Sequence, residues 1–309
     1  MEIDSGPGLE PSKPPTGDFV VGATGLVSRT LTVWSRNIVA YLIIFGVLNV
    51  IMIGLQFALL WMVFGADAFI LMQYVASDPM SFILSVFNLI LLYPDPTILS
   101  MFIPLAAIIM VISMVIVAIV AGATIKYAFD DYGPRQADIG SSISYAISKA
   151  GAIIGAQLLV GAIGVAILAP AVLYLFTVTS YAELGTALLL FLVCIIVVLY
   201  VGVRLAPTIA VVIAEDRGPI DAIKRSWAIT SGQFLHIFGG QIVLGIVVVI
   251  LGLVLGLFIG VFSLMLGPFF LLISSMISGL IFGAITYVFQ VVLYRDLEAR
   301  HGETSQALW

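Results

Sequence analysis

The stretch LGTALLLFLVCIIVVLYVGV, from Leu184 to Val203, decides the fold class because it contains no charged side chain. An α-helix of about 20 apolar residues, rising about 1.5 Å per residue, crosses the ~30 Å hydrocarbon core of a bilayer. The stretch therefore predicts a transmembrane helix. Cys194, the single cysteine of the chain, lies in the middle of it. With no second cysteine for an internal disulfide, it acts in hydrocarbon as a small apolar side chain.

The composition of the whole chain is typical of a membrane protein with several spans. Its 309 residues are 62% hydrophobic and 9% charged, whereas a soluble domain is roughly 25% charged. The net charge of −5 argues against nucleic acid as a partner, because nucleic-acid binding needs a basic surface. We therefore expect one all-α membrane domain, over residues 19–300.

Six stretches are long and apolar enough to be spans of this domain. The acidic residues 1–18, rich in Pro and Gly, are expected to form a disordered cytoplasmic tail, and residues 301–309 a second tail. The segment 80–92 is short for a span, and its helix start at Asp78 and Pro79 favours a helix in, or dipping into, the outer interface. The predicted spans are 38–64, 99–125, 150–177, 184–203, 234–261 and 269–293.

The basic residues predict the orientation of these spans. All 12 lie before the first span, between even- and odd-numbered spans, or after the sixth, and the alternate loops hold only acidic charges. Basic residues near span ends stay in the cytoplasm, so both termini are predicted to be cytoplasmic, in the cell membrane. The basic residues are Lys13, Arg29, Arg36, Lys126, Arg135, Lys149, Arg204, Arg217, Lys224, Arg225, Arg295 and Arg300.

A short interfacial helix, which we call an elbow, is predicted before each odd-numbered span, over residues 26–36, 139–149 and 219–232. In the last of these, Ile220, Ile223 and Trp227 fall on one helical face, as in a helix with Trp at headgroup depth. Together with the motif Gly-x-Gln-x-x-x-Gly, found at residues 155–161 and 239–245, the elbows predict three pseudo-repeats of elbow plus helical hairpin. Convergent membrane composition is the alternative explanation of the matches.

Few polar side chains lie inside the predicted spans, and three glutamines are candidates for a polar cavity: Gln157, Gln241 and Gln290. Such amides usually bond across helices and stabilise packing by ~0.6 kcal/mol. If they converge, they bind a polar solute or a lipid headgroup instead.

Arg204 is unusual because it follows an apolar run and precedes Pro207. One interpretation is that its side chain extends to the cytoplasmic interface. The other is a cytoplasmic lock, in which Glu215, Asp216 or Asp296 pairs with Arg204 and holds the fourth span to the cytoplasmic layer.

Residues 207–232 carry a motif in which an apolar run ends in Glu215, a Gly-Pro turn follows, and a helix contains Arg225, Ser226 and Trp227. With the closing Leu-Tyr-Arg-Asp-Leu at residues 293–297, the motif resembles a membrane-domain family related to the membrane part of glycerophosphoryl diester phosphodiesterases. The resemblance implies the fold and makes Arg225, Ser226 and Trp227 part of the interfacial elbow. The catalytic barrel of the family's fusions has no counterpart in these residues, so no catalysis is implied.

No motif of an enzyme accompanies these features. The chain lacks a His-Glu-x-x-His helix, a Gly-x-Ser-x-Gly elbow and a Gly-Lys-Ser/Thr phosphate loop, and no cofactor is implied. The sequence therefore predicts a non-catalytic membrane module that contacts lipids, partner membrane proteins or a second copy of itself. The alternative is a passive pore or transporter for a small or amphipathic solute.

Overall fold

The computed structural model describes residues 19–65, 96–133, 136–266 and 268–306, and within these ranges the regular secondary structure is entirely helical. Residues 1–18 and 80–92, for which a tail and an interfacial helix were predicted, lie outside the described residues. The helices are α1 (Ala23–Arg36), α2 (Ile38–Phe64), α5 (Pro96–Tyr132), α6 (Ile139–Leu175), α7 (Tyr181–Leu205), α8 (Thr208–Glu215), α9 (Pro219–Ile229), α10 (Phe234–Leu266) and α11 (Pro268–Gln306).

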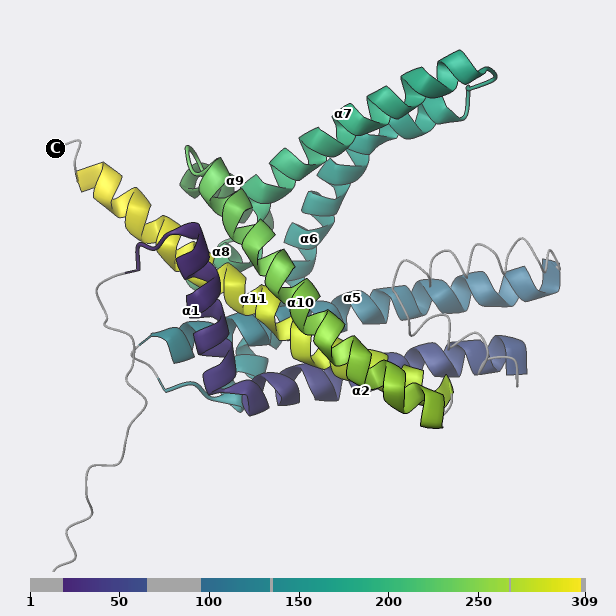
Figure 1. The fold of residues 1–309 in the computed structure, drawn as a ribbon, viewed down its shortest axis with the longest axis horizontal. Helices are drawn as coiled ribbons and strands as arrows, with labels where there is room; N and C mark the ends of the chain where they lie inside the picture. The colour runs from purple at the N-terminus through teal and green to yellow at the C-terminus, as the bar shows by residue number, and fades with distance from the viewer. Residues whose placement is uncertain (1–18, 66–95, 134–135, 267, 307–309) are drawn as a thin grey trace, which may run out of the picture.

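The helices extend from a common junction in two directions (Figure 1). Helices α2, α5, α10 and α11 leave it together, whereas α6 and α7 form a hairpin that projects away from them. The short helices α1, α8 and α9 lie at the junction. The basic side chains gather at this end of the molecule, on α1, the last turns of α5 and α7, the first turns of α6, the turn between α8 and α9, and helices α9 and α11. We call it the basic end.

Five helical segments of the described residues are long and apolar enough to cross a membrane, as expected for a multi-pass membrane protein. A sixth is obtained if α1 and α2, which meet at an angle of 80°, count as one span. Helix α2 has the predicted bounds of the first span, and α11 runs beyond the sixth span into the predicted tail, as far as Gln306. The five segments are Ala107–Tyr132, Ile139–Leu175, Tyr181–Glu215, Phe234–Phe262 and Gly279–His301.

Two of the three predicted elbows are separate helices, and the prediction for the third is wrong. Helix α1 ends at Asn37, with φ −125° and ψ 38°, and α9 is separated from α10 by Gly232, with φ 75°. Residues 139–149 instead form the first turns of α6, which continues to Leu175. Helix α6 begins where the Asp138 side chain accepts a hydrogen bond from the Ser141 amide at 2.7 Å, and no residue with left-handed backbone interrupts it.

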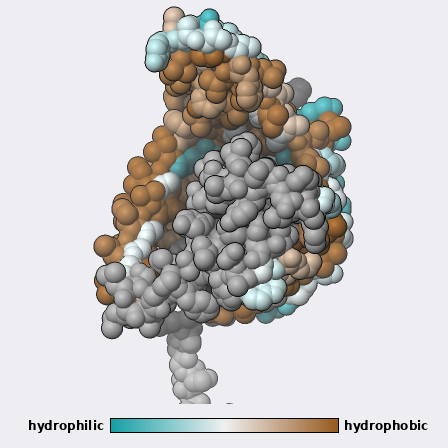
Figure 2. Space-filling view, turned by 90° about the vertical axis from the view of Figure 1, so that its right-hand side faces the viewer, coloured by the Kyte–Doolittle hydropathy of each residue, from teal (hydrophilic) through white to brown (hydrophobic). Residues whose placement is uncertain are grey.

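The buried core lies at the basic end. Fully buried side chains from α1, α2, α5, α6, α10 and α11 meet there, whereas the outer halves of α6, α7 and α10 expose large apolar side chains. Figure 2 shows hydrophobic residues over the projecting hairpin, with hydrophilic residues at its outer end. The largest fully buried side chains include Leu26, Tyr41, Ile125, Ile153, Ile237, Ile285, Leu293 and Tyr294.

Candidate functional site

An open groove of about 430 Å³ lies where α7, α10 and α11 meet, and two of the three candidate glutamines line it. Gln241 of α10 and Gln290 of α11 face the groove together with Thr286. Gln157 is not one of its lining residues, so the predicted three-glutamine cavity contains only two of its members. Gln157 belongs to the α6–α7 hairpin, which diverges from α10 (Figure 1). The lining residues are Gly202, Ala206, Gln241, Leu244, Gly245, Val248, Thr286, Phe289 and Gln290.

The side chain of Gln290 lines this groove and has an unsatisfied hydrogen-bond acceptor. Its Oε1 atom is buried and, within the described part of the chain, accepts no hydrogen bond. A buried acceptor without a donor costs roughly 1–3 kcal/mol. The groove is otherwise mainly apolar, so a molecule with an apolar body and one hydrogen-bond donor is complementary to it.

Arg204 is buried, and its contacts are with Trp227. Its Nη2 donates to the Trp227 carbonyl at 2.7 Å, and its guanidinium carbon lies 4.5 Å from the centre of the indole ring. In the described residues Glu215, Asp216 and Asp296 form ion pairs with other residues and not with Arg204, so the predicted partners of the lock are wrong. Because α9 packs directly on the end of α7, the indole ring and the carbonyl of Trp227 lie closer to Arg204 than any of these carboxylates does.

Small side chains of α9 and its C-terminal cap fit against the end of α7. Ser226 and Thr230 donate hydrogen bonds from their hydroxyls to the Arg204 carbonyl, at 3.0 and 3.2 Å. Ile220 and Trp227 remain exposed on the surface of the helix. The elbow is thus a helix held to α7 by hydrogen bonds and by the Trp227 ring, with Ile220 and part of Trp227 exposed to other molecules.

Glu215, at the end of α8, joins three elements. Its Oε1 accepts from Arg225 Nε of α9 at 2.8 Å and from the Tyr294 hydroxyl of α11 at 3.0 Å. Its Oε2 accepts from Arg217. The predicted elbow residue Arg225 therefore serves to hold α8 against α9.

Asp296 of α11 is completely buried and holds the start of the described chain in place. Its Oδ1 accepts from the Val21 backbone amide at 2.8 Å. Its Oδ2 lies 2.8 Å from His236 Nε2 of α10 and accepts from Arg300 Nε at 3.0 Å. Glu215 and Asp296 are therefore centres of two separate networks, and neither belongs to Arg204.

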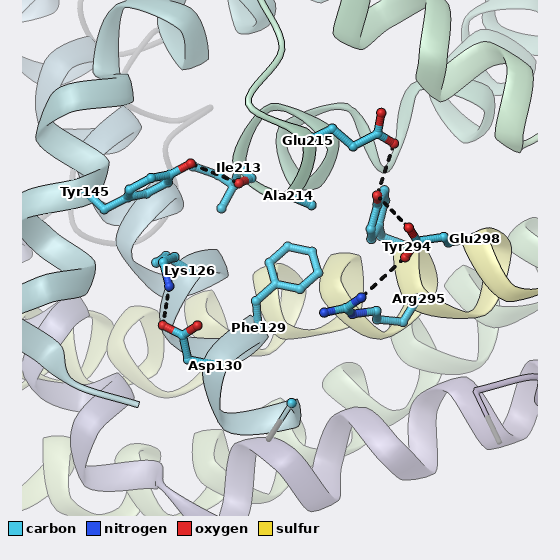
Figure 3. Close-up of a pocket in the computed structure, with 11 residues that line it drawn as sticks. Lys126, Phe129, Asp130, Tyr145, Ile213, Ala214, Glu215, Tyr294, Arg295 and Glu298 are labelled. Atoms are coloured by element: carbon cyan, nitrogen blue, oxygen red, sulfur yellow. Dashed lines mark hydrogen bonds and ion pairs between the residues drawn. The ribbon is translucent and has the colours of Figure 1, made fainter. Parts of the chain in front are cut away.

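A second cavity, of about 480 Å³, lies at the basic end between α5, α6, α8 and α11 (Figure 3). Sequence reasoning missed it, although one signal was present: the polar residues Tyr294 and Glu298 are four residues apart and so share one face of α11. Its lining residues are Lys126, Phe129, Asp130, Gly133, Tyr145, Ile213, Ala214, Glu215, Tyr294, Arg295 and Glu298.

No group of three or more His, Cys, Asp or Glu side chains is placed to hold a metal ion in the part of the chain that the structure describes. That the protein needs no cofactor stays a prediction.

No family model matches this chain, and neither a curated protein nor a solved structure matches it. The resemblance to the phosphodiesterase-associated membrane family accordingly stays a prediction that rests on the motifs of residues 207–232 and 293–300.

Proposed function

We propose that the protein is a non-catalytic membrane module that binds lipid, with its basic end in the cytoplasm. The observation that carries the proposal is the open groove between α7, α10 and α11, which has apolar walls and the buried, unpartnered Oε1 of Gln290. An acyl chain fits the apolar walls, and a hydroxyl or amide near the polar end of the lipid supplies the missing hydrogen-bond donor.

The surroundings of the groove support lipid as its occupant. The α6–α7 hairpin diverges from α10 on one side of it (Figure 1), and the facing surfaces are apolar. Exposed side chains include Leu192, Ile196 and Leu199 of α7, and Ile246 and Val249 of α10. In a bilayer these surfaces contact acyl chains, so lipid reaches the groove laterally without crossing a polar barrier.

The elbow supports contact with the bilayer surface. Ile220 and Trp227 are exposed on α9, and Lys224 of the same helix is 74% exposed at its side chain. Trp is enriched at headgroup depth because its ring is apolar and its N–H is polar. Partner membrane proteins and a second copy of the chain are alternative occupants of the same apolar surface.

Filling the groove tests the proposal. A Cβ at Gly245 would have no atom within 4 Å, so Gly245→Leu places a side chain in the groove without a clash. Gly252→Leu is the matched control: it lies two turns further along α10, also in open space, and outside the groove. We expect Gly245→Leu, but not Gly252→Leu, to reduce the lipid that remains bound in native mass spectrometry of gently solubilised protein.

Two results would count against lipid binding at this site. One is equal lipid retention by both variants. The other is movement of a small polar solute through liposomes containing the protein, at a rate that Gln241→Leu and Gly245→Leu abolish. The second result would favour the pore or transporter, because it would show that the groove is part of a hydrated path.

A further inference from the structure

The charged side chains of the second cavity are of two kinds: some are paired with residues of other helices, and others with a residue of their own helix. Glu215 is fixed between helices by Arg225 and Tyr294, and it is part of the framework. Among the described residues, the ion pairs of Lys126 and Arg295 are with carboxylates on their own helices. Lys126 pairs with Asp130, and Arg295 Nη1 lies 3.4 Å from Glu298 Oε2.

These two intrahelical pairs are exchangeable. Pairs of this spacing contribute only a few tenths of a kcal/mol to a helix, and the Arg295–Glu298 distance of 3.4 Å is long for a charge-assisted hydrogen bond. Neither ion pair joins two helices; in the described part of the chain, the ring contacts of these cations with other helices are those of Lys126 with the Tyr145 ring and of Arg295 with the Phe129 ring. The cavity thus offers two cations and two carboxylates that are free to change partners.

The two cations line the same cavity from two different helices. In Figure 3, Lys126 of α5 and Arg295 of α11 approach the cavity from opposite sides, with the Phe129 ring between them. The guanidinium carbon of Arg295 lies 5.2 Å from the centre of that ring, which holds it at the cavity wall. Tyr145 lies beside Lys126, whose Nζ is 5.7 Å from the centre of its ring, and donates its hydroxyl to the Ile213 carbonyl at 3.1 Å.

We propose that this cavity binds a zwitterionic group that carries a phosphate and an amine. Arg295 and Lys126 would bind the phosphate, since the guanidinium fork matches phosphate oxygens, and Asp130 and Glu298 would bind the ammonium. A purely anionic ligand would lie against these carboxylates, and a purely cationic one against Lys126 and Arg295. The cavity volume of about 480 Å³ is within the range of small-ligand sites.

This inference goes beyond the lipid groove and does not depend on it, because the two pockets share no lining residue. The ligand has two possible sources, a lipid headgroup or a free soluble compound. Ethanolamine phosphate is the soluble probe, and nanodiscs of phosphatidylethanolamine or phosphatidylglycerol are the lipid probes. Binding is measured by calorimetry for the soluble compound and by native mass spectrometry for lipids.

The test compares Arg295→Gln and Glu298→Gln with Lys224→Gln, an exposed lysine of α9 outside the cavity. Loss of one charge-assisted hydrogen bond weakens binding by roughly ten-fold or more, so both cavity variants should bind more weakly and Lys224→Gln should not. Glu298→Gln is included because Glu298 is half-exposed, so this variant should fold even if Arg295→Gln does not. Gly245→Leu should leave binding of ethanolamine phosphate unchanged.

If ethanolamine phosphate binds saturably and the cavity variants weaken this binding, the inference is supported and the ligand is a soluble compound. If the protein retains phosphatidylethanolamine but does not bind ethanolamine phosphate, and the same variants lose the lipid, the inference is supported and the ligand is a lipid headgroup. Binding of neither probe overturns it, as does equal binding of inorganic phosphate or phosphatidylglycerol. Binding that the cavity variants leave unchanged also overturns it.

Discussion

The guanidinium of Arg204 lies over the indole ring of Trp227, 4.5 Å from its centre, and donates a hydrogen bond to the Trp227 carbonyl at 2.7 Å. A charge at the end of a long apolar helix is thus stabilised by a neighbouring helix, although the buried Nε of Arg204 has no hydrogen-bond partner among the described residues. The contact ties α9, whose apolar face is exposed, to the end of α7. The two helices meet beside the groove, whose lining includes Gly202 and Ala206 of α7.

Arg204→Ala should destabilise the protein. It removes a charge-assisted hydrogen bond and a cation–π contact, which together are worth about 2 kcal/mol or more. Thermal unfolding in detergent measures the effect. Lys224→Ala, a change at an exposed lysine of α9, should leave the melting temperature nearly unchanged. Arg204→Lys should restore only part of the stability, because an ammonium cannot stack on the indole as a planar guanidinium does. An unchanged melting profile for Arg204→Ala would reject this role.

Asp296→Asn should release the start of the described chain. The buried carboxylate accepts from the Val21 amide and from Arg300, and breaking a buried charge pair costs about 3 kcal/mol. We expect a lower melting temperature and faster proteolysis near Val21. The control is Asp221→Asn, which changes an exposed carboxylate 3.9 Å from Lys224. Equal proteolysis of the two variants would contradict the assignment.

Gly155→Ala should separate α6 from α9. A Cβ at Gly155 would lie 2.7 Å from Pro219 Cγ, and a proline ring attached to the helix backbone cannot rotate away. Gly151→Ala, one turn earlier on α6, places its methyl group in open space. Because Ala favours helix over Gly by up to about 1 kcal/mol, Gly151→Ala should be neutral or stabilising. Thermal unfolding of both variants checks the difference, and equal melting temperatures would argue against the close contact.

Gln290→Leu should have opposite effects on the lipid-free and lipid-bound protein. It removes a buried acceptor that has no donor, so delipidated protein should melt at a higher temperature than the unmodified protein. Added lipid should then stabilise the variant less, because the lipid no longer finds its acceptor. Lipid stabilisation equal to that of the unmodified protein would show that Gln290 does not contact the lipid.

The orientation of the basic end is testable by cysteine labelling in a Cys194→Ser background. Glu183→Cys lies at the α6–α7 turn and Lys224→Cys at the basic end. The predicted orientation requires that a membrane-impermeant maleimide label Glu183→Cys in intact cells, and Lys224→Cys only after permeabilisation. The reverse pattern would place the basic end outside.

The sequence by itself determined the helical membrane class and the approximate positions of the spans. Hydrophobic length is a local property, so the bounds of α2 and the start of α10 at Phe234 could be predicted from the chain alone. Turn residues are also local signals, and Gly218 and Pro219 correctly marked the start of α9. The same local reasoning failed at residues 139–149, because their polar character does not break a helix.

Only the tertiary structure decided which polar residues meet. One of the two interpretations of Arg204 paired it with a carboxylate because opposite charges attract, but helix packing placed Trp227 beside it instead. The predicted cavity grouped Gln157 with Gln241 and Gln290, whereas only Gln241 and Gln290 line the groove. Apolar spans carry little information about their neighbours, since one lipid-facing helix surface resembles another. Partner choice is therefore set by the few close contacts and buried polar groups at the basic end, and these become visible only once the helices are packed.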